Sequence, residues 1–194
     1  MCACVTLALG AYVAQRTPVR LDVEAVALRG TGVPLAVFFT RLGRWPVLLA
    51  LGCAAGIAAW QLRSGVAAVA ALMIAQVVSQ GVNALLKHVF HRTRPDHWLH
   101  RLEPDLSYPS GHSVSAVVFF AGMAILAWHA PLPFPLAAAL VVAFVLCAAG
   151  IPWSRLALGA HYPTDVIGGL FFGAAVLCVA FAAIARIYAA TVPR

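Results

Sequence analysis

Three short polar blocks hold the side chains of this sequence that could do chemistry. They supply three cations, two imidazoles, one carboxylate and a Ser-Gly pair: Lys87, Arg94, Arg155, His112, His161, Asp165, Ser110 and Gly111. Arginine and lysine bind phosphoryl oxygens, and an imidazole can attack phosphorus or transfer a proton. These residue types are typical of a site for a tetrahedral oxyanion.

The second block, Pro109-Ser110-Gly111-His112, directly precedes an apolar run. Proline in a first turn and serine near a cap indicate a helix start, and a helix N-terminus offers free N–H groups and a positive dipole end to an anion. Glycine also lets the backbone approach a ligand closely. On its own, this block equally fits an ordinary capped helix with a surface histidine.

The third block places His161 four residues before Asp165, with Pro163 between them. Residues at i and i+4 share one face of a helix, and proline fits the first helical turn. A carboxylate beside an imidazole fixes its tautomer and raises the basicity of the far nitrogen. Alone, these residues also fit a capping aspartate and a histidine at the membrane interface.

The composition predicts the elements that position these blocks. Of 194 residues, 63% are hydrophobic and 10% are charged, and the mean hydropathy is +0.93. Soluble domains carry about 25% charged residues, so the composition argues against a soluble enzyme and excludes disorder. We expect an all-α fold, a polytopic membrane helical bundle of about six transmembrane helices, as a single domain over residues 1–194.

Stretches without Asp, Glu, Lys or Arg give the expected spans. Five are expected to cross a bilayer core of about 30 Å: residues 45–62, 64–86, 113–129, 136–151 and 166–185. The prolines at 131, 133 and 135 divide the longest charge-free run into two helices, because proline is costly in a helix interior.

The N-terminal region is expected to add a short inserted helix and an interfacial one. Residues 1–15 are apolar but short. Residues 16–44 mix charged and apolar side chains, which favours an interfacial amphipathic helix followed by a turn around Thr31-Gly32. The five cysteines lie in apolar runs without metal-ligand spacing, so we expect small core residues instead of a metal site or a disulfide framework.

The expected topology brings the three blocks together. The first block holds Lys87 and Arg94, and only a loop separates it from the second block. Two spans separate the second block from the third, so all three emerge at one membrane face. Lys87 ends a span, where a charge is costly and often functional. Five polar loop residues are expected to be merely solvated: His97, His100, Arg101, Glu103 and Asp105. The net charge of +7 therefore serves a phosphate site and a lipid bilayer, and we expect no nucleic-acid partner.

In order and spacing, the blocks resemble the three-part signature of the type 2 phosphatidic acid phosphatase family. The matching residues are Lys87-x6-Arg94-Pro95, Pro109-Ser110-Gly111-His112 and Ser154-Arg155-x5-His161-x3-Asp165. The resemblance covers residues 87–165, and its lipid branch has six transmembrane helices. The short first helix departs from that pattern.

The resemblance implies that His161, His112 and Asp165 are catalytic. His161 would attack phosphorus and become phospho-histidine, while Asp165 holds its other ring nitrogen. His112 would protonate the leaving oxygen and then activate the water that releases phosphate.

The resemblance also implies a phosphate cradle. Lys87, Arg94 and Arg155 would surround the phosphoryl oxygens, together with the backbone N–H groups of Ser110 and Gly111. Since these cations take the place of a metal ion, we expect no metal and no other cofactor.

The sequence favours a membrane phosphatase for a lipid phosphate or diphosphate, and family analogy favours undecaprenyl diphosphate. Phosphatidic acid, phosphatidylglycerophosphate, a polyprenyl-sugar phosphate and lipid A are alternative substrates. A lipid-to-lipid phosphotransferase or a vanadate-dependent haloperoxidase would use the same residues. A transporter is an alternative of another class, because intramembrane polar residues could line a path or pack helices: Gln76, Ser79, Gln80 and Asn83.

The resemblance implies a bacterial cytoplasmic membrane with the site facing the periplasm or the cell exterior. The distribution of Lys and Arg argues for the opposite orientation, because most of them would then lie outside. The sequence predicts no particular oligomeric state.

Overall fold

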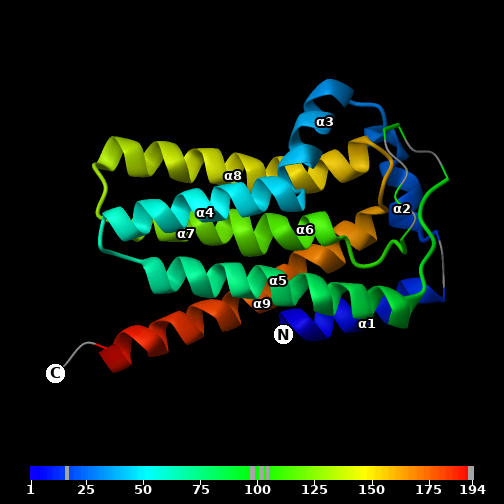
Figure 1. Cartoon of the computed structure of the whole chain (residues 1–194). Helices are drawn as coiled ribbons and strands as arrows, with labels where there is room; N and C mark the ends of the chain where they lie inside the picture. The colour runs from blue at the N-terminus through cyan, green and yellow to red at the C-terminus, as the bar shows by residue number, and fades with distance from the viewer. Residues whose placement is uncertain (16–17, 97–98, 101–102, 104, 192–194) are drawn as a thin grey trace.

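The computed structural model describes residues 1–15, 18–96, 99–100, 103 and 105–191. The regular structure in these ranges is helical, which confirms the all-α prediction (Figure 1). The elements are α1 (Cys2–Ala14), α2 (Arg20–Glu24), the 3₁₀ helix η1 (Ala25–Leu28), α3 (Val33–Leu42), α4 (Trp45–Gln61), α5 (Val66–Phe90), α6 (Gly111–Ser115), the π-helix η2 (Ala116–Ala121), α7 (Gly122–His129), α8 (Phe134–Ala157) and α9 (Pro163–Thr191).

Four helical rods of the described chain are long and apolar enough to cross a membrane. They are α5, the continuous rod α6–η2–α7, α8, and α9 as far as Arg186. The helices α3 and α4 make a fifth span if the 57° bend between them is counted within one span. The helix α1 has 13 residues, roughly 20 Å at 1.5 Å per residue, which is short of a bilayer core. The predicted multi-span bundle is confirmed, whereas the number six is not.

Prolines set several helix starts, and the one at Pro163 is as predicted from the sequence. Proline occupies the first turn of α3, α4 and α8, and Pro163 begins α9, because a first-turn residue needs no N–H for the helix. Three helices run beyond their expected ends, including α9, which continues to Thr191. The helix α5 continues to Phe90, which places Lys87 in its last turn, and α8 continues through Pro152 to Ala157.

The rod α6–η2–α7 forms the centre of the bundle. Buried residues make up 61% of its span, against 17% to 28% in the other three spans. Val114, Phe119 and Phe120 of this rod pack with Leu72 of α5 and Ile151 of α8 in the main core. The second block therefore begins the most enclosed helix of the molecule.

The N-terminal region differs in detail from the prediction. Two short helices, α2 and η1, take the place of one amphipathic helix, and α3 follows them. The expected turn is confirmed, since Gly30 and Gly32 have φ of 84° and 56°, values that suit glycine.

The cysteines were wrongly expected in the core. Cys4, Cys53 and Cys178 are exposed, and Cys2 and Cys147 are half-buried. An outward position in a membrane bundle contacts lipid and is as apolar as the core, so an apolar run does not distinguish the two environments.

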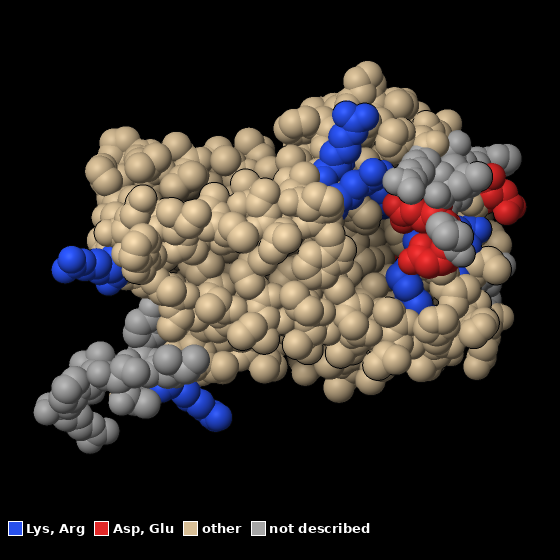
Figure 2. Space-filling model, viewed as in Figure 1, with Lys and Arg blue, Asp and Glu red and all other residues tan. Residues whose placement is uncertain are grey.

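Charged side chains gather at one end of the bundle. Figure 2 shows the acidic side chains there, together with a group of basic ones beside a hollow in the surface. Arg63 follows α4 and Arg186 lies near the end of α9, and these two helices end at the opposite end of the bundle (Figure 1). The long sides between the two ends are almost free of charge in this view, as lipid-facing surfaces require.

Candidate active site

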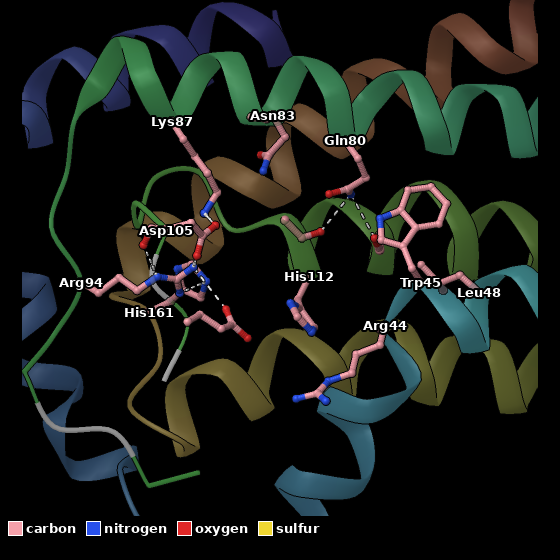
Figure 3. Close-up of a pocket in the computed structure, with 15 residues that line it drawn as sticks. Arg44, Trp45, Leu48, Gln80, Asn83, Lys87, Arg94, Asp105, His112 and His161 are labelled. Carbon is pink, nitrogen blue, oxygen red and sulfur yellow. Dashed lines mark hydrogen bonds and ion pairs between the residues drawn. The ribbon is translucent and has the colours of Figure 1, made fainter. Parts of the chain in front are cut away.

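A pocket of about 450 Å³ opens at the charged end of the bundle. Five of the predicted site residues line it: Lys87, Arg94, Gly111, His112 and His161. The apolar side chains of Trp45 and Leu48 on α4 also belong to its wall. Figure 3 shows polar side chains of α5 pointing into this space from one side and His161 and His112 from the other.

His161 connects the pocket to the protein behind it. Its Nε2 lies 2.9 Å from Nη1 of Arg94, and its Nδ1 lies 3.4 Å from Oδ2 of Asp165. Because α9 begins at Pro163, the two residues do not share a helical face as predicted; a turn ahead of the helix brings them together. The N–H of Tyr162 also donates to Oδ2 of Asp165, at 2.9 Å.

The surroundings of His161 favour a neutral ring. Burial, and then the positive charges of Arg94, Arg155 and Lys87, hold its pKa well below 6.5. Since Arg94 can only donate, Nε2 accepts, and the single ring proton lies on Nδ1 toward Asp165. A neutral imidazole with its lone pair on the pocket side is the form that can attack phosphorus.

Three of the cations at the pocket are paired with two loop carboxylates. Nζ of Lys87 lies 2.7 Å from Oδ2 of Asp105, and Arg94 forms ion pairs with Asp105 and, at 3.2 Å, with Glu103. Nη2 of Arg155 lies 2.9 Å from Oε2 of Glu103. We call these five residues the pocket network.

Two of the loop residues expected to be solvated were therefore wrongly assigned. Glu103 and Asp105 neutralise the phosphate-binding candidates. Burial raises the pKa of Asp105, but the hydrogen bonds and charges of Lys87 and Arg94 outweigh it and hold that pKa below its usual value. His100 is exposed as expected, and His97 and Arg101 lie outside the described residues.

Arg155, Asp165 and Ser110 lie behind the pocket wall. Arg155 is buried at the end of α8, and its Nη1 donates to Oγ1 of Thr40 at 2.5 Å. Arg155 is connected to the pocket through its ion pair with Glu103, which lines the pocket. The N–H of Ser110, expected to contact phosphate, instead donates to the carbonyl of Asp165 at 3.1 Å. Ser110 is the N-cap of α6, so Pro109 precedes the helix and is not in its first turn.

His112 stands at the start of the central rod. It lines the pocket, and its Nε2 has no hydrogen-bond partner among the described residues. A close approach between α6 and α9 fixes this position, because a Cβ at Gly169 would lie 2.6 Å from the carbonyl oxygen of Ser110. His112 can therefore give a proton to a group in the pocket or take one from it.

A second, fully buried set of ionic residues lies behind His161, and the sequence did not indicate it. Nη1 of Arg92 lies 2.5 Å from Oδ1 of Asp165 and 2.6 Å from Oγ1 of Thr164, while its Nη2 lies 2.5 Å from Oδ2 of Asp22. Thr164 donates its N–H and its hydroxyl to Oδ1 of Asp22. We call Asp22, Arg92, Thr164 and Asp165 the buried network.

The buried network orients Asp165. This carboxylate also accepts hydrogen bonds from the hydroxyl of Ser107 and the N–H of Tyr162, and the Tyr162 ring lies 4.4 Å from the Arg92 guanidinium carbon. The position of Arg92 inside the first block, two residues before Arg94, marks it as a candidate, but nothing in the sequence relates it to Asp22 or Asp165.

The polar residues of α5 bind the central rod. Nε2 of Gln76 donates to Oγ of Ser115 at 2.8 Å, and Nε2 of Gln80 donates to the carbonyl of Gly111 at 3.2 Å. Gln80 and Asn83 also line the pocket. These contacts favour helix packing over a transport path. In the described part of the chain, no group of three or more His, Cys, Asp or Glu side chains is arranged to hold a metal ion.

Comparison with known proteins gives one family. The model of the PAP2 superfamily matches residues 64–188. A lipid A 1-phosphatase of Rhizobium johnstonii is 39% identical over 117 residues, which cover 55% of this chain and 44% of the relative. The putative undecaprenyl-diphosphatase YbjG of Escherichia coli is 34% identical over 120 residues, 59% of this chain and 56% of the relative. The chain thus matches about half the length of these relatives.

A solved structure shares the fold over nearly the whole chain. It is the crystal structure of a transmembrane PAP2-type phosphatidylglycerolphosphate phosphatase from Bacillus subtilis, with a TM-score of 0.77 and 23% sequence identity. The likeness covers 95% of this chain and 96% of that one.

Proposed function

Because the chain belongs to the PAP2 superfamily, we propose that it is a membrane-bound phosphatase that hydrolyses a lipid phosphate or diphosphate in the pocket described above. One observation carries the proposal: a neutral histidine, a second histidine whose Nε2 has no hydrogen-bond partner among the described residues, and a set of cations share one pocket with apolar side chains of α4. Phosphoryl transfer needs the polar groups, and a lipid tail needs the apolar wall.

In the first step, Nε2 of His161 attacks phosphorus and the bond between phosphorus and the leaving oxygen breaks. His112 gives its proton to that oxygen, and the phosphoryl group stays on His161 as phospho-histidine. Arg94, which now donates to Nε2, transfers its hydrogen bonds to the phosphoryl oxygens. Lys87, Arg155 and the backbone at Gly111 are proposed to stabilise the same oxygens.

In the second step, His112 removes a proton from water, and the water oxygen attacks phosphorus. The bond between phosphorus and Nε2 breaks, which releases phosphate and regenerates neutral His161. Asp165 holds the Nδ1 proton throughout, so the imidazole keeps one orientation during both transfers. A lipid alcohol in place of water would give phosphotransfer by the same route.

Among substrates, undecaprenyl diphosphate is our first choice, with undecaprenyl phosphate and phosphate as products. The name of the Escherichia coli relative supports it. The name of the Rhizobium relative makes lipid A with a 1-phosphate the second candidate. Phosphatidic acid and phosphatidylglycerophosphate complete the panel to be tested.

The test is phosphate release by the purified protein in detergent across this panel. We expect release from at least one lipid substrate, and a loss of at least about 10³-fold in kcat/KM for His161→Ala, because every substrate needs the nucleophile. Exposed His88→Ala, on α5, is the matched control and should retain activity. Release that is equal in wild type and His161→Ala would contradict the mechanism.

We also infer that the pocket end faces the periplasm or the cell exterior of a bacterial cytoplasmic membrane. The positive-inside rule argues against this orientation, but four cations at the pocket end belong to the site whichever way the chain inserts: Lys87, Arg92, Arg94 and Arg155. A cysteine at exposed His100, in a background without the native cysteines, should react with an impermeant thiol reagent on intact cells. Reaction only after lysis would indicate the opposite orientation.

A further inference from the structure

Arg44 is a cation of the pocket that none of the three blocks contains. It is the N-cap residue of α4 and is half-buried, and its side chain lines the pocket beside Trp45 (Figure 3). Within the described part of the chain, its guanidinium has no hydrogen-bond or ion-pair partner. It therefore differs from Lys87 and Arg94, whose charges are neutralised in the pocket network.

An unpaired guanidinium that has lost part of its water favours an anion beside it. The pocket holds Glu103 and Asp105, but these carboxylates bind the other cations. We therefore expect the negative partner of Arg44 to be a ligand that enters the pocket. At Arg44, a substrate anion can gain a contact without displacing a carboxylate of the protein.

Arg44 lies on the side of His112 that faces away from His161. The backbone next to Arg44 touches the His112 ring, because a Cβ at Gly43 would lie 2.7 Å from its Cδ2. The positive charge of Arg44 acts on His112 and on Arg155. Figure 3 shows His112 between His161 and Arg44.

This order places Arg44 beside the leaving group. In phosphoryl transfer, the attacking and leaving atoms lie roughly in line on opposite sides of phosphorus. With His161 as the attacking group and His112 as the acid, the leaving oxygen lies at His112, and the next part of the substrate lies toward Arg44.

We propose that Arg44 binds an anionic leaving group and thereby selects lipid diphosphates over lipid monophosphates. The inference rests on the proposed phosphatase function and goes one step further, to the substrate class. When a diphosphate reacts, His161 bonds to the terminal phosphorus, and the bond from that phosphorus to the bridging oxygen breaks. The electron pair stays on the bridging oxygen, which takes the proton from His112 as in the first step above. The lipid monophosphate that leaves is still an anion, and Arg44 can bind it with two N–H groups.

A lipid monophosphate offers Arg44 no such anion. Its leaving group is an alcohol oxygen that takes a proton from His112, and the carbon chain beyond it is neutral. The two substrate types therefore make the same contacts with His161 and the pocket network and differ in their contact with Arg44.

The experiment compares two substrates with one tail, farnesyl diphosphate and farnesyl monophosphate, in the same detergent. For Arg44→Gln we expect kcat/KM for the diphosphate to fall about 10- to 100-fold, as for loss of a hydrogen bond between charged groups, with less than about threefold change for the monophosphate. Arg44→Lys, which keeps a point charge without the planar fork, should give an intermediate loss on the diphosphate alone.

Arg41→Gln is the matched control, since Arg41 is exposed on α3 and does not line the pocket. It removes the same charge three residues away and should leave the ratio of the two kcat/KM values unchanged. An equal loss on both substrates, or no loss for Arg44→Gln, would overturn the role of Arg44. Wild-type protein that releases phosphate from neither substrate nor from the lipid panel would instead overturn the proposed function.

Discussion

The pocket network and the buried network lie on opposite sides of His161 and use the same chemistry in different surroundings. In the buried network, the side chains of Arg92, Asp22 and Asp165 are 0% exposed. In the pocket network, Asp105 is 52% exposed and Glu103 is 24% exposed. Both sets pair guanidinium groups with carboxylates, so burial, and not residue type, separates them.

Burial decides what each network can do. Removing one partner of a buried ion pair costs about 3–5 kcal/mol, because the other charge is left without water or a counter-charge. A solvent-exposed pair contributes only about 0–1 kcal/mol. The buried network is therefore suited to fix Asp165 and His161 in place, and the pocket network is suited to exchange its carboxylates for the phosphoryl oxygens of a substrate.

The largest effect is expected from breaking the buried network at Arg92. Arg92→Gln leaves Asp22 and Asp165 as buried carboxylates that no Lys or Arg of the described residues pairs with, so the free energy of unfolding should fall by about 3 kcal/mol or more. The kcat/KM should fall by about 10²-fold, as when the carboxylate that orients a reactive histidine is disturbed. Thermal unfolding in detergent and phosphate release measure the two quantities.

A matched substitution distinguishes this effect from the loss of any positive charge. Arg186→Gln removes an exposed arginine at the opposite end of the bundle and should change neither quantity appreciably. Arg92→Lys keeps the charge but cannot reach both carboxylates, so it should lie between wild type and Arg92→Gln. Wild-type stability and activity in Arg92→Gln would mean that the buried network does not hold Asp165.

A smaller effect is expected from the pocket network. Asp105→Asn and Glu103→Gln remove the anions that, in the proposed mechanism, compete with phosphate for Lys87, Arg94 and Arg155. We expect inorganic phosphate to inhibit each variant at a concentration several-fold lower than for wild type. The loss of unfolding free energy should be smaller than that of Arg92→Gln, because Asp105 and Glu103 are partly exposed, unlike Asp22 and Asp165.

Asp96→Asn is the control for this comparison, because Asp96 is exposed and does not line the pocket. It should leave inhibition by phosphate unchanged. Weaker inhibition in Asp105→Asn or Glu103→Gln would show the opposite role, in which the carboxylates hold the cations in position for phosphate.

The sequence predicted what depends on local pattern. Runs without charge gave the spans, first-turn prolines such as Pro163 gave helix starts, and the two-span separation between the blocks placed them at one end of the bundle. Hydropathy could not distinguish a core position from a lipid-facing one, so the cysteines were wrongly placed. Hydropathy also could not predict the bend between α3 and α4, which places Arg44 at the pocket.

Contacts between distant segments were beyond prediction. Asp22 and Arg92 are 70 residues apart, and no periodicity relates them. Glu103 and Asp105 lie in a polar stretch that looks like any solvated loop, and only the fold brings them against Lys87 and Arg155. The N–H of Ser110 was expected to be free because helix starts leave such groups unpaired, but the carbonyl of Asp165 lies within reach of it.

The last expected effect is a dependence of stability on pH that comes from His161, where the two networks meet. Its pKa in the folded protein lies well below 6.5, whereas an unfolded histidine binds a proton near pH 6.5. As the pH falls below 6.5, His161 takes up a proton in the unfolded chain but not in the folded protein. The contribution of His161 to the free energy of unfolding is thus complete above pH 6.5 and is lost toward the lower pKa, by up to about 1.4 kcal/mol per pH unit.

The measurement compares the thermal midpoints of wild type and His161→Gln in detergent between pH 7.5 and pH 5. Wild type should lose more stability than the variant over this range, and His88→Gln, at an exposed position, accounts for the loss of one imidazole. The ion pair of Asp105 does not interfere, because the pKa of that carboxyl is held below 3.8 and the group stays charged throughout. Parallel curves for wild type and His161→Gln would mean that the pKa of His161 is the same in the folded and the unfolded chain. That result would contradict the neutral His161 on which the proposed nucleophile depends.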